Sequence, residues 1–143
     1  MVERDVVLGK LAIIDRCTRR IHEVRSERRS ELQPLDVEEI VILNLQRAVQ
    51  AAIDLAAHVV AAEGYGLPDS LAGTFSLLEQ RGVIGADLAE RLRRMVGFRN
   101  IVVHDYRVID PRIVDSIVEN SMTDLRAFAS QVLVKFELSE AES

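Results

Sequence analysis

The chain has 143 residues, of which 48% are hydrophobic and only 4% aromatic, and it has no tryptophan. This length predicts one domain, residues 1–143, with a substantial hydrophobic core. Because Ala, Leu, Ile and Val supply the apolar content, packed helices are favoured over an aromatic-rich β-sandwich. A single cysteine, Cys17, excludes an internal disulfide and indicates a reducing compartment.

The sequence pattern does not indicate a membrane protein. No basic-then-apolar leader opens the sequence, so no secretory signal is expected. The apolar run at 48–62 is interrupted by Gln50, Asp54 and His58, which indicates a buried helix rather than a membrane span. We therefore expect a soluble, cytoplasmic protein that does not contact a membrane.

The formal net charge is −5, but the charges are unevenly distributed along the chain. Residues 36–80 contain one Arg and seven acids, whereas residues 81–114 contain seven Arg and four acids. The basic segment could face a phosphate group, or it could be a solvated helix face, and the charge count leaves both readings open.

The first three expected helices are bounded by proline, glycine and capping residues. Apolar residues at three- and four-residue spacing predict a first helix over about 5–31, which Gln33-Pro34 ends. Asp36 then resembles the N-cap of a second helix that runs to about residue 62. A short third helix is capped by Asp69 or Ser70 and ends at Arg81-Gly82.

The fourth helix is expected to begin after Gly85 and to include the β-branched run 101–103. This run could pass for a strand in isolation, but it continues a helical stripe of the residues Leu88, Leu92, Met95, Arg99, Val102 and Tyr106. Asp110-Pro111 opens a fifth helix that fades near Leu138. The predicted fold is an all-α up-and-down bundle of four long helices and one short helix.

One stripe of the second helix is polar, although the rest of that helix is apolar. The stripe contains Asn44, Arg47, Asp54 and His58, which span an arc of roughly 80°. Buried polar groups are costly unless they are paired. The stripe therefore faces a polar cleft or a partner subunit, unless Arg47 and Asp54 satisfy each other inside the fold.

Arg99, Asn100, His104 and Tyr106 form the most informative motif. An arginine can stabilise charge on phosphorus, and a histidine can move protons near neutral pH. Arg99 and His104 are separated by about 140° around an ideal helix, so a single copy makes a poor bifunctional site. Two copies that meet across a twofold axis would place both residue pairs in one groove, which predicts a homodimer. Asn100 shares a helix face with His104 and could orient its ring.

Several other chemistries lack their residues. The sequence has no Gly-rich phosphate loop and no His-Glu-x-x-His motif, and its three histidines and one cysteine show no metal-ligand spacing. We therefore expect neither a metal nor a cofactor. Acid–base chemistry on a ligand that brings its own nucleophile remains, and RNA qualifies through its 2′-hydroxyl group.

The run Arg99-Asn100-x-x-x-His104-x-Tyr106 resembles the R-x-x-x-x-H-x-Y signature of HEPN-domain toxins of the HepT-like type. Segments 52–60, 75–84 and 91–100 are also similar to the corresponding parts of that family. The resemblance implies a homodimeric, metal-independent ribonuclease whose two motifs share one cleft, in a toxin–antitoxin system of the type II or type VII kind.

The same resemblance implies a role for each motif residue. His104 would be the general acid or base, Arg99 would bind the scissile phosphate, and Asn100 would support His104 or the phosphate. Tyr106 would receive AMP from a minimal nucleotidyltransferase antitoxin, and the substrate would be an RNA such as tRNA or mRNA. Further contacts to RNA or to a partner subunit are expected from Arg47, Asp54, His58, Arg93, Arg94 and Arg107.

A second function class remains open at this point. The dimer could be a non-catalytic module that binds a nucleotide or a protein partner, with the groove holding a phosphate and the polar stripe serving assembly.

Overall fold

The computed structural model describes residues 1–27, 32–105 and 111–138, without the side chains of residues 27, 100–105, 111–115 and 117. In chain order the helices are α1 (Arg4–His22), a π-helical turn η1 (Glu23–Glu27), α2 (Pro34–Glu63), α3 (Leu71–Gln80), α4 (Ala86–Asp105) and α5 (Pro111–Lys135). The described part of the chain thus has four long helices and one short one, and it contains no strand. This confirms the predicted all-α bundle.

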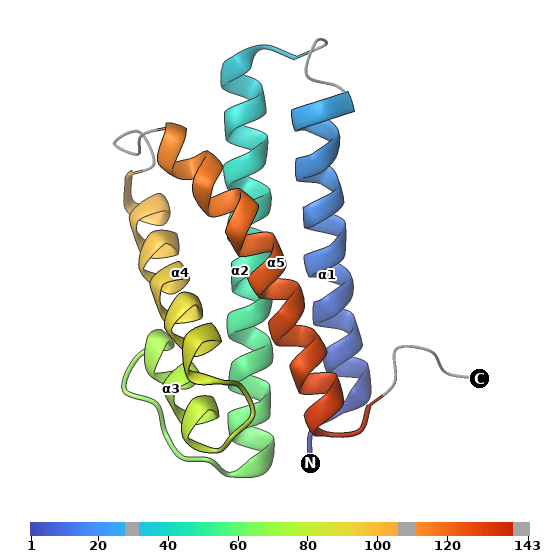
Figure 1. Ribbon diagram of the computed structural model, residues 1–143, viewed down its shortest axis with the longest axis vertical. Coiled ribbons are helices and arrows are strands. Elements are labelled where there is room, and N and C mark those ends of the chain that lie inside the picture. Colours follow the sequence, from blue (N-terminus) through green and yellow to red (C-terminus); the bar gives the residue numbers. More distant parts are fainter. Residues whose placement is uncertain (28–31, 106–110, 139–143) are drawn as a thin grey trace, which may run out of the picture.

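α2 is the central helix of the bundle. In Figure 1, α1 and α4 lie on either side of α2, α5 crosses it obliquely, and α3 lies beside the lower half of α4. The contact between α1 and α2 is the most extensive in the fold. Leu45, Leu55 and Val59 on α2 are completely buried, which explains why this helix is apolar around most of its circumference.

By length and composition alone, α2 could cross a membrane. However, 61% of its most apolar stretch is buried inside the bundle. A core helix of a globular protein passes the same test, so the composition of α2 is accounted for by its packing.

The start of α2 differs from the sequence prediction. The helix begins at Pro34 with Gln33 as its N-cap, and Asp36 lies in the first turn instead of capping it. Proline suits the first helical position, because its fixed φ matches the helix and its missing N–H would have no partner there. The negative charge of Asp36 still favours this end through the helix dipole.

The end of the first helix was also predicted imperfectly. The α-helix ends at His22, and a π-helical turn continues from Glu23 to Glu27; residues 28–31 lie outside the described chain. The second helix was expected to run to about residue 62, and α2 ends at Glu63, with Gly64 as its C-cap at a φ of 66° that glycine adopts without strain.

The boundaries of the later helices agree closely with expectation. Ser70, one of two candidate caps, is the N-cap of α3, and its side chain accepts a 3.0 Å hydrogen bond from the N–H of Gly73. Residues 101–103 are helical and lie within α4. α5 starts at Pro111 as predicted and ends at Lys135, slightly before Leu138; the expected cap, Asp110, lies outside the described residues.

Candidate functional site

The motif lies at the carboxyl-terminal end of α4. Arg99, Asn100 and His104 all belong to this helix, whereas Tyr106 and Arg107 lie outside the described residues, as do the side chains of Asn100 and His104. Because the backbone is helical from Arg99 through His104, the two positions are about 140° apart around the helix axis.

Arg99 is held against the central helix by a hydrogen-bond network. Its Nη2 donates to Oε1 of Gln50 over 2.8 Å, and Nε2 of Gln50 donates to Oδ1 of Asp54 over 2.9 Å. The ammonium group of Lys10 on α1 lies 3.4 Å from Oδ2 of the same aspartate. We call these four residues the Arg99 network; it connects α4, α2 and α1.

Sequence reasoning included Arg99 and Asp54 among the site residues but missed Gln50 and Lys10. Gln50 had been noted only as an interruption of an apolar run. Its spacing of four residues from Asp54 was the available signal, because side chains at i and i+4 lie on the same helix face. No pattern in the sequence indicated Lys10, which is 44 residues away from its partner.

The Arg47–Asp54 pair, which was the alternative to a polar cleft or an interface, is not the contact that satisfies Asp54 on the polar stripe of α2. Asp54 contacts Lys10 and Gln50, and Arg47 is exposed. The Asn44 side chain is buried and donates to the backbone oxygen of Ile40 over 2.9 Å, within its own helix. These contacts leave Arg47 as the cation of the stripe that is open to solvent.

His58, the last residue of the stripe, has a structural partner. Its Nε2 accepts a 3.0 Å hydrogen bond from the backbone N–H of Glu3, the N-cap of α1. This contact requires an unprotonated Nε2, because a ring nitrogen that carries a proton can only donate. The geometry assigns His58 to holding the start of α1 against the end of α2.

The two other predicted arginines on α4 have carboxylate partners. Nη1 of Arg93 lies 2.9 Å from Oε1 of Glu79 and 3.4 Å from Oγ of Ser76, so it braces α3 against α4. Arg94 is exposed and pairs with Glu90 one turn earlier, at 2.8 Å.

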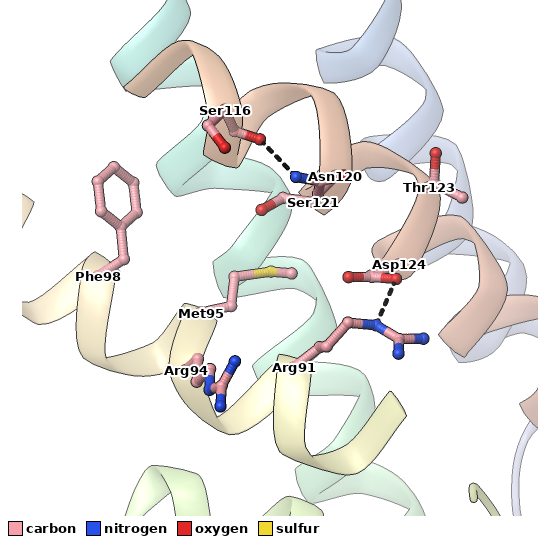
Figure 2. Close-up of a pocket in the computed structure, with 9 residues that line it drawn as sticks. All are labelled: Arg91, Arg94, Met95, Phe98, Ser116, Asn120, Ser121, Thr123 and Asp124. Atoms are coloured by element: carbon pink, nitrogen blue, oxygen red, sulfur yellow. Dashed lines mark hydrogen bonds and ion pairs between the residues drawn. The ribbon is translucent and has the colours of Figure 1, made fainter. Parts of the chain in front are cut away.

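A pocket of about 580 Å³ lies between α4 and α5. Figure 2 shows Arg91 and Asp124 pointing toward each other across it, with their Nε and Oδ1 atoms 3.0 Å apart, and with Met95 and Phe98 along the α4 side. Arg99 follows Phe98 and leaves the helix about 100° away from it, and it donates a hydrogen bond to Gln50 on α2. The pocket and the Arg99 network therefore lie on different faces of α4.

Two further features concern titratable side chains. Burial raises the pKa of the Cys17 thiol, while the positive charges of Arg47 and Arg16 act in the opposite direction. Among the residues that the structure describes, no cluster of three or more His, Cys, Asp or Glu side chains could hold a metal ion.

Comparison with known proteins identifies the family. Residues 14–132 match the family described as Ribonuclease HepT-like. The chain is 38% identical over 124 residues to the mRNA nuclease HepT of Shewanella oneidensis, which covers 87% of this chain and 93% of the relative.

Solved structures give the same result. One is the tri-AMPylated HEPN toxin of Shewanella oneidensis in complex with MNT antitoxin, with a TM-score of 0.84, 36% identity, and 92% and 99% of the two chains covered. Another is a chain from a toxin–antitoxin crystal structure with AMP-PNP, with a TM-score of 0.83, 35% identity, and 91% and 98% covered. The chain therefore belongs to the HepT-like ribonuclease family.

Proposed function

We propose that this chain is the ribonuclease toxin of a toxin–antitoxin pair and that it cleaves RNA through Arg99 and His104 without a metal ion. The observation that carries the proposal is the placement of Arg99 in a chain that is 38% identical to an mRNA nuclease over most of its length. Arg99 is half-buried near the end of α4, where Gln50 holds its guanidinium group. A guanidinium held in place is suited to binding a phosphodiester.

The proposed reaction needs no external nucleophile. His104 removes the proton from the 2′-hydroxyl, the 2′-oxygen forms a bond to phosphorus, and the bond from phosphorus to the 5′-oxygen breaks. The departing 5′-oxygen takes a proton from a protonated His104, which produces a cyclic phosphate and a 5′-hydroxyl. Water can then hydrolyse the cyclic phosphate to a 3′-phosphate. Arg99 stabilises the charge that accumulates on the phosphoryl oxygens, and Asn100 supports His104 or contacts the phosphate.

A homodimer is part of the proposal. α4 is helical from Arg99 through His104, so the two positions are about 140° apart around the helix axis of a single protomer. Two protomers related by a twofold axis would supply an Arg99 and a His104 to each phosphate from opposite sides. We further propose a single-domain, cytoplasmic protein whose candidate substrates are mRNA and tRNA.

The antitoxin is proposed to be a minimal nucleotidyltransferase that adds AMP to Tyr106. Relatives with this fold form complexes with MNT antitoxin, and one of those relatives is AMPylated. AMP on a tyrosine two residues beyond His104 would place negative phosphate at the mouth of the groove, where it would repel RNA.

The test is to induce the full chain in cells that lack the antitoxin and to follow both growth and total RNA. We expect growth arrest and new RNA fragments from the wild type, and neither from His104→Ala or Arg99→Ala. The control is His22→Ala, which removes an exposed histidine of α1 and should still arrest growth.

Other outcomes contradict the proposal. Normal growth and intact RNA with the wild type would favour a non-catalytic binding module. Arrest with His104→Ala would exclude this histidine as the catalyst. Coexpression with the nucleotidyltransferase should restore growth to the wild type but not to a Tyr106→Phe variant.

A further inference from the structure

We propose that Gln50 and Asp54 are positioning residues for the reaction, because they fix the guanidinium group of Arg99 where the scissile phosphate binds. This inference rests on the proposed function, in which Arg99 contacts the phosphate. It assigns a catalytic consequence to two residues of α2 that lie outside the motif.

The direction of the hydrogen bonds is determined by chemistry. A guanidinium group can only donate and a carboxylate can only accept. The amide of Gln50 lies between one of each, so its oxygen must face Arg99 and its nitrogen must face Asp54. A flipped amide would place its NH2 group against the N–H donor of Arg99 and its oxygen against the carboxylate acceptor of Asp54. Asp54 therefore favours the orientation in which the Gln50 oxygen accepts from Arg99.

The charge of the partner also matters. The carboxylates of Asp124, Glu79 and Glu90 pair directly with other arginines of α4. Gln50 is a neutral amide, so this hydrogen bond orients Arg99 and itself brings no negative charge that would compete with a phosphate. The charged carboxylate of Asp54 contacts Gln50 on the side away from Arg99. Lys10 lies 3.4 Å from the Oδ2 atom of this carboxylate.

The segment of α2 that carries Gln50 is packed in the core and is therefore rigid. Gln50 is flanked in sequence by Val49 and Ala51, which are 2% and 3% exposed, so the backbone that carries it is packed into the core. An arginine side chain loses rotamer entropy when it is fixed. A hydrogen bond from a rigid helix confines that side chain before RNA binds, which is the condition for efficient transition-state stabilisation.

The test is steady-state ribonuclease kinetics on the purified full chain with an RNA oligonucleotide that the wild type cleaves. We expect Gln50→Ala to lower kcat by about 10- to 100-fold, because the loss of a positioning contact misplaces the catalytic group. KM should change by less than about threefold, since the variant removes an interaction that matters in the transition state. Gln46→Ala, a half-buried glutamine one turn earlier on the same helix, is the matched control and should keep wild-type kinetics.

Asp54 provides the rescue experiment. Asp54→Asn retains an oxygen that can accept from Gln50, so its kcat should remain within about threefold of the wild type. Asp54→Ala removes that acceptor and allows the amide to flip, so its kcat should fall by about 10-fold. Equal kcat values for these two variants would contradict the orienting role of Asp54.

Arg99→Ala separates this inference from the proposed function. This variant should abolish cleavage, whereas Gln50→Ala should only lower its rate, because Gln50 acts through Arg99. If Arg99→Ala is inactive but Gln50→Ala matches the Gln46→Ala control, the positioning role is wrong and the proposed function stands. If Arg99→Ala still cleaves RNA, or the wild type does not, the proposed function fails and the inference fails with it.

Thermal midpoints of all variants distinguish misplacement of Arg99 from unfolding. A loss of kcat that merely tracks a lowered midpoint would overturn the inference.

Discussion

Nε2 of His58, near the end of α2, accepts a hydrogen bond from the backbone N–H of Glu3 at the start of α1, and the two residues are 55 positions apart. The side chain of His58 on α2 caps the start of α1, so this contact fixes how far the two helices are shifted along their axes relative to each other. Lys10, which belongs to the Arg99 network, lies two turns further along α1.

This contact predicts that His58→Ala destabilises the fold without a direct effect on chemistry. The loss of one partly exposed helix-cap acceptor should cost about 1 kcal/mol of unfolding free energy and lower the thermal midpoint by about 2–4 °C. Thermal unfolding of the purified chain measures the change. His22→Ala, an exposed histidine of α1, is the control, and equal midpoints for the two variants would show that the hydrogen bond contributes nothing.

The aromatic contact between α3 and α5 predicts a larger loss of stability. Phe75 and Phe128 are 1% and 0% exposed, and their rings meet edge to face with centroids 5.5 Å apart. Phe128→Ala should lower the unfolding free energy by about 3–5 kcal/mol, because it leaves a cavity in the core. Denaturant unfolding measures this, and Val134→Ala, at a position 78% exposed, should change it by less than about 0.5 kcal/mol.

Variants of the ion pair between Arg93 and Glu79 distinguish a structural role of Arg93 from a contact with RNA. The pair is one-third exposed on both sides, so a double-mutant cycle should give a coupling energy of about 0.5–1 kcal/mol. If Arg93 also contacts RNA, Arg93→Ala should weaken RNA binding and reduce its salt dependence. Glu79→Ala removes the same pair but retains the cation, so it should bind RNA at least as well as the wild type.

The thiol of Cys17 predicts a pH effect with a defined sign. Burial raises its pKa in the folded state, so folding favours the protonated thiol. The resulting stability is fully present below the pKa of the unfolded chain and is lost as the pH rises through the higher folded pKa. Cys17→Ala should remove this alkaline component from the pH profile of unfolding.

The reactivity of the Cys17 thiol also measures the electrostatic influence of Arg47. The charge of Arg47 lowers the pKa of Cys17, so Arg47→Ala should raise that pKa and slow the reaction with a thiol reagent at a given alkaline pH. The pH dependence of the reaction rate measures the pKa of Cys17 in the wild type and in Arg47→Ala. A faster reaction in Arg47→Ala, with the fold intact, would contradict the electrostatic influence of this arginine.

Arg99→Lys tests whether charge alone is sufficient at the site. Lysine keeps the charge but lacks the planar group that can hold Gln50 and a phosphate together. We expect kcat/KM to fall by about 100-fold, a loss comparable to that of one preorganised transition-state donor. Cleavage assays measure the activity, and a 2′-deoxy oligonucleotide measures binding without turnover. Wild-type cleavage by Arg99→Lys would mean that a point charge is enough.

Local signals determined most of the fold. The apolar spacing, Ser70 as a cap, Gly64 and Gly82 after helices, and Pro111 at a helix start all act within a few residues, so the helices could be read from the sequence. The error was also local: Pro34 was interpreted only as ending the first helix, but it is the first residue of α2, so Asp36 lies in the first turn and is not the N-cap. A proline can do both, and only the chain on either side of it decides between them.

The sequence by itself determined the helical class, the membership of a ribonuclease family and the motif that includes Arg99 and His104. Only the tertiary structure decided which polar residues meet: Arg99 with Gln50, Asp54 with Lys10, and His58 with Glu3. The physical reason is that a hydrogen bond between helices depends on the height and rotation of both helices. Those quantities are determined by the packing of the whole core, and no residue pattern within a single helix encodes them.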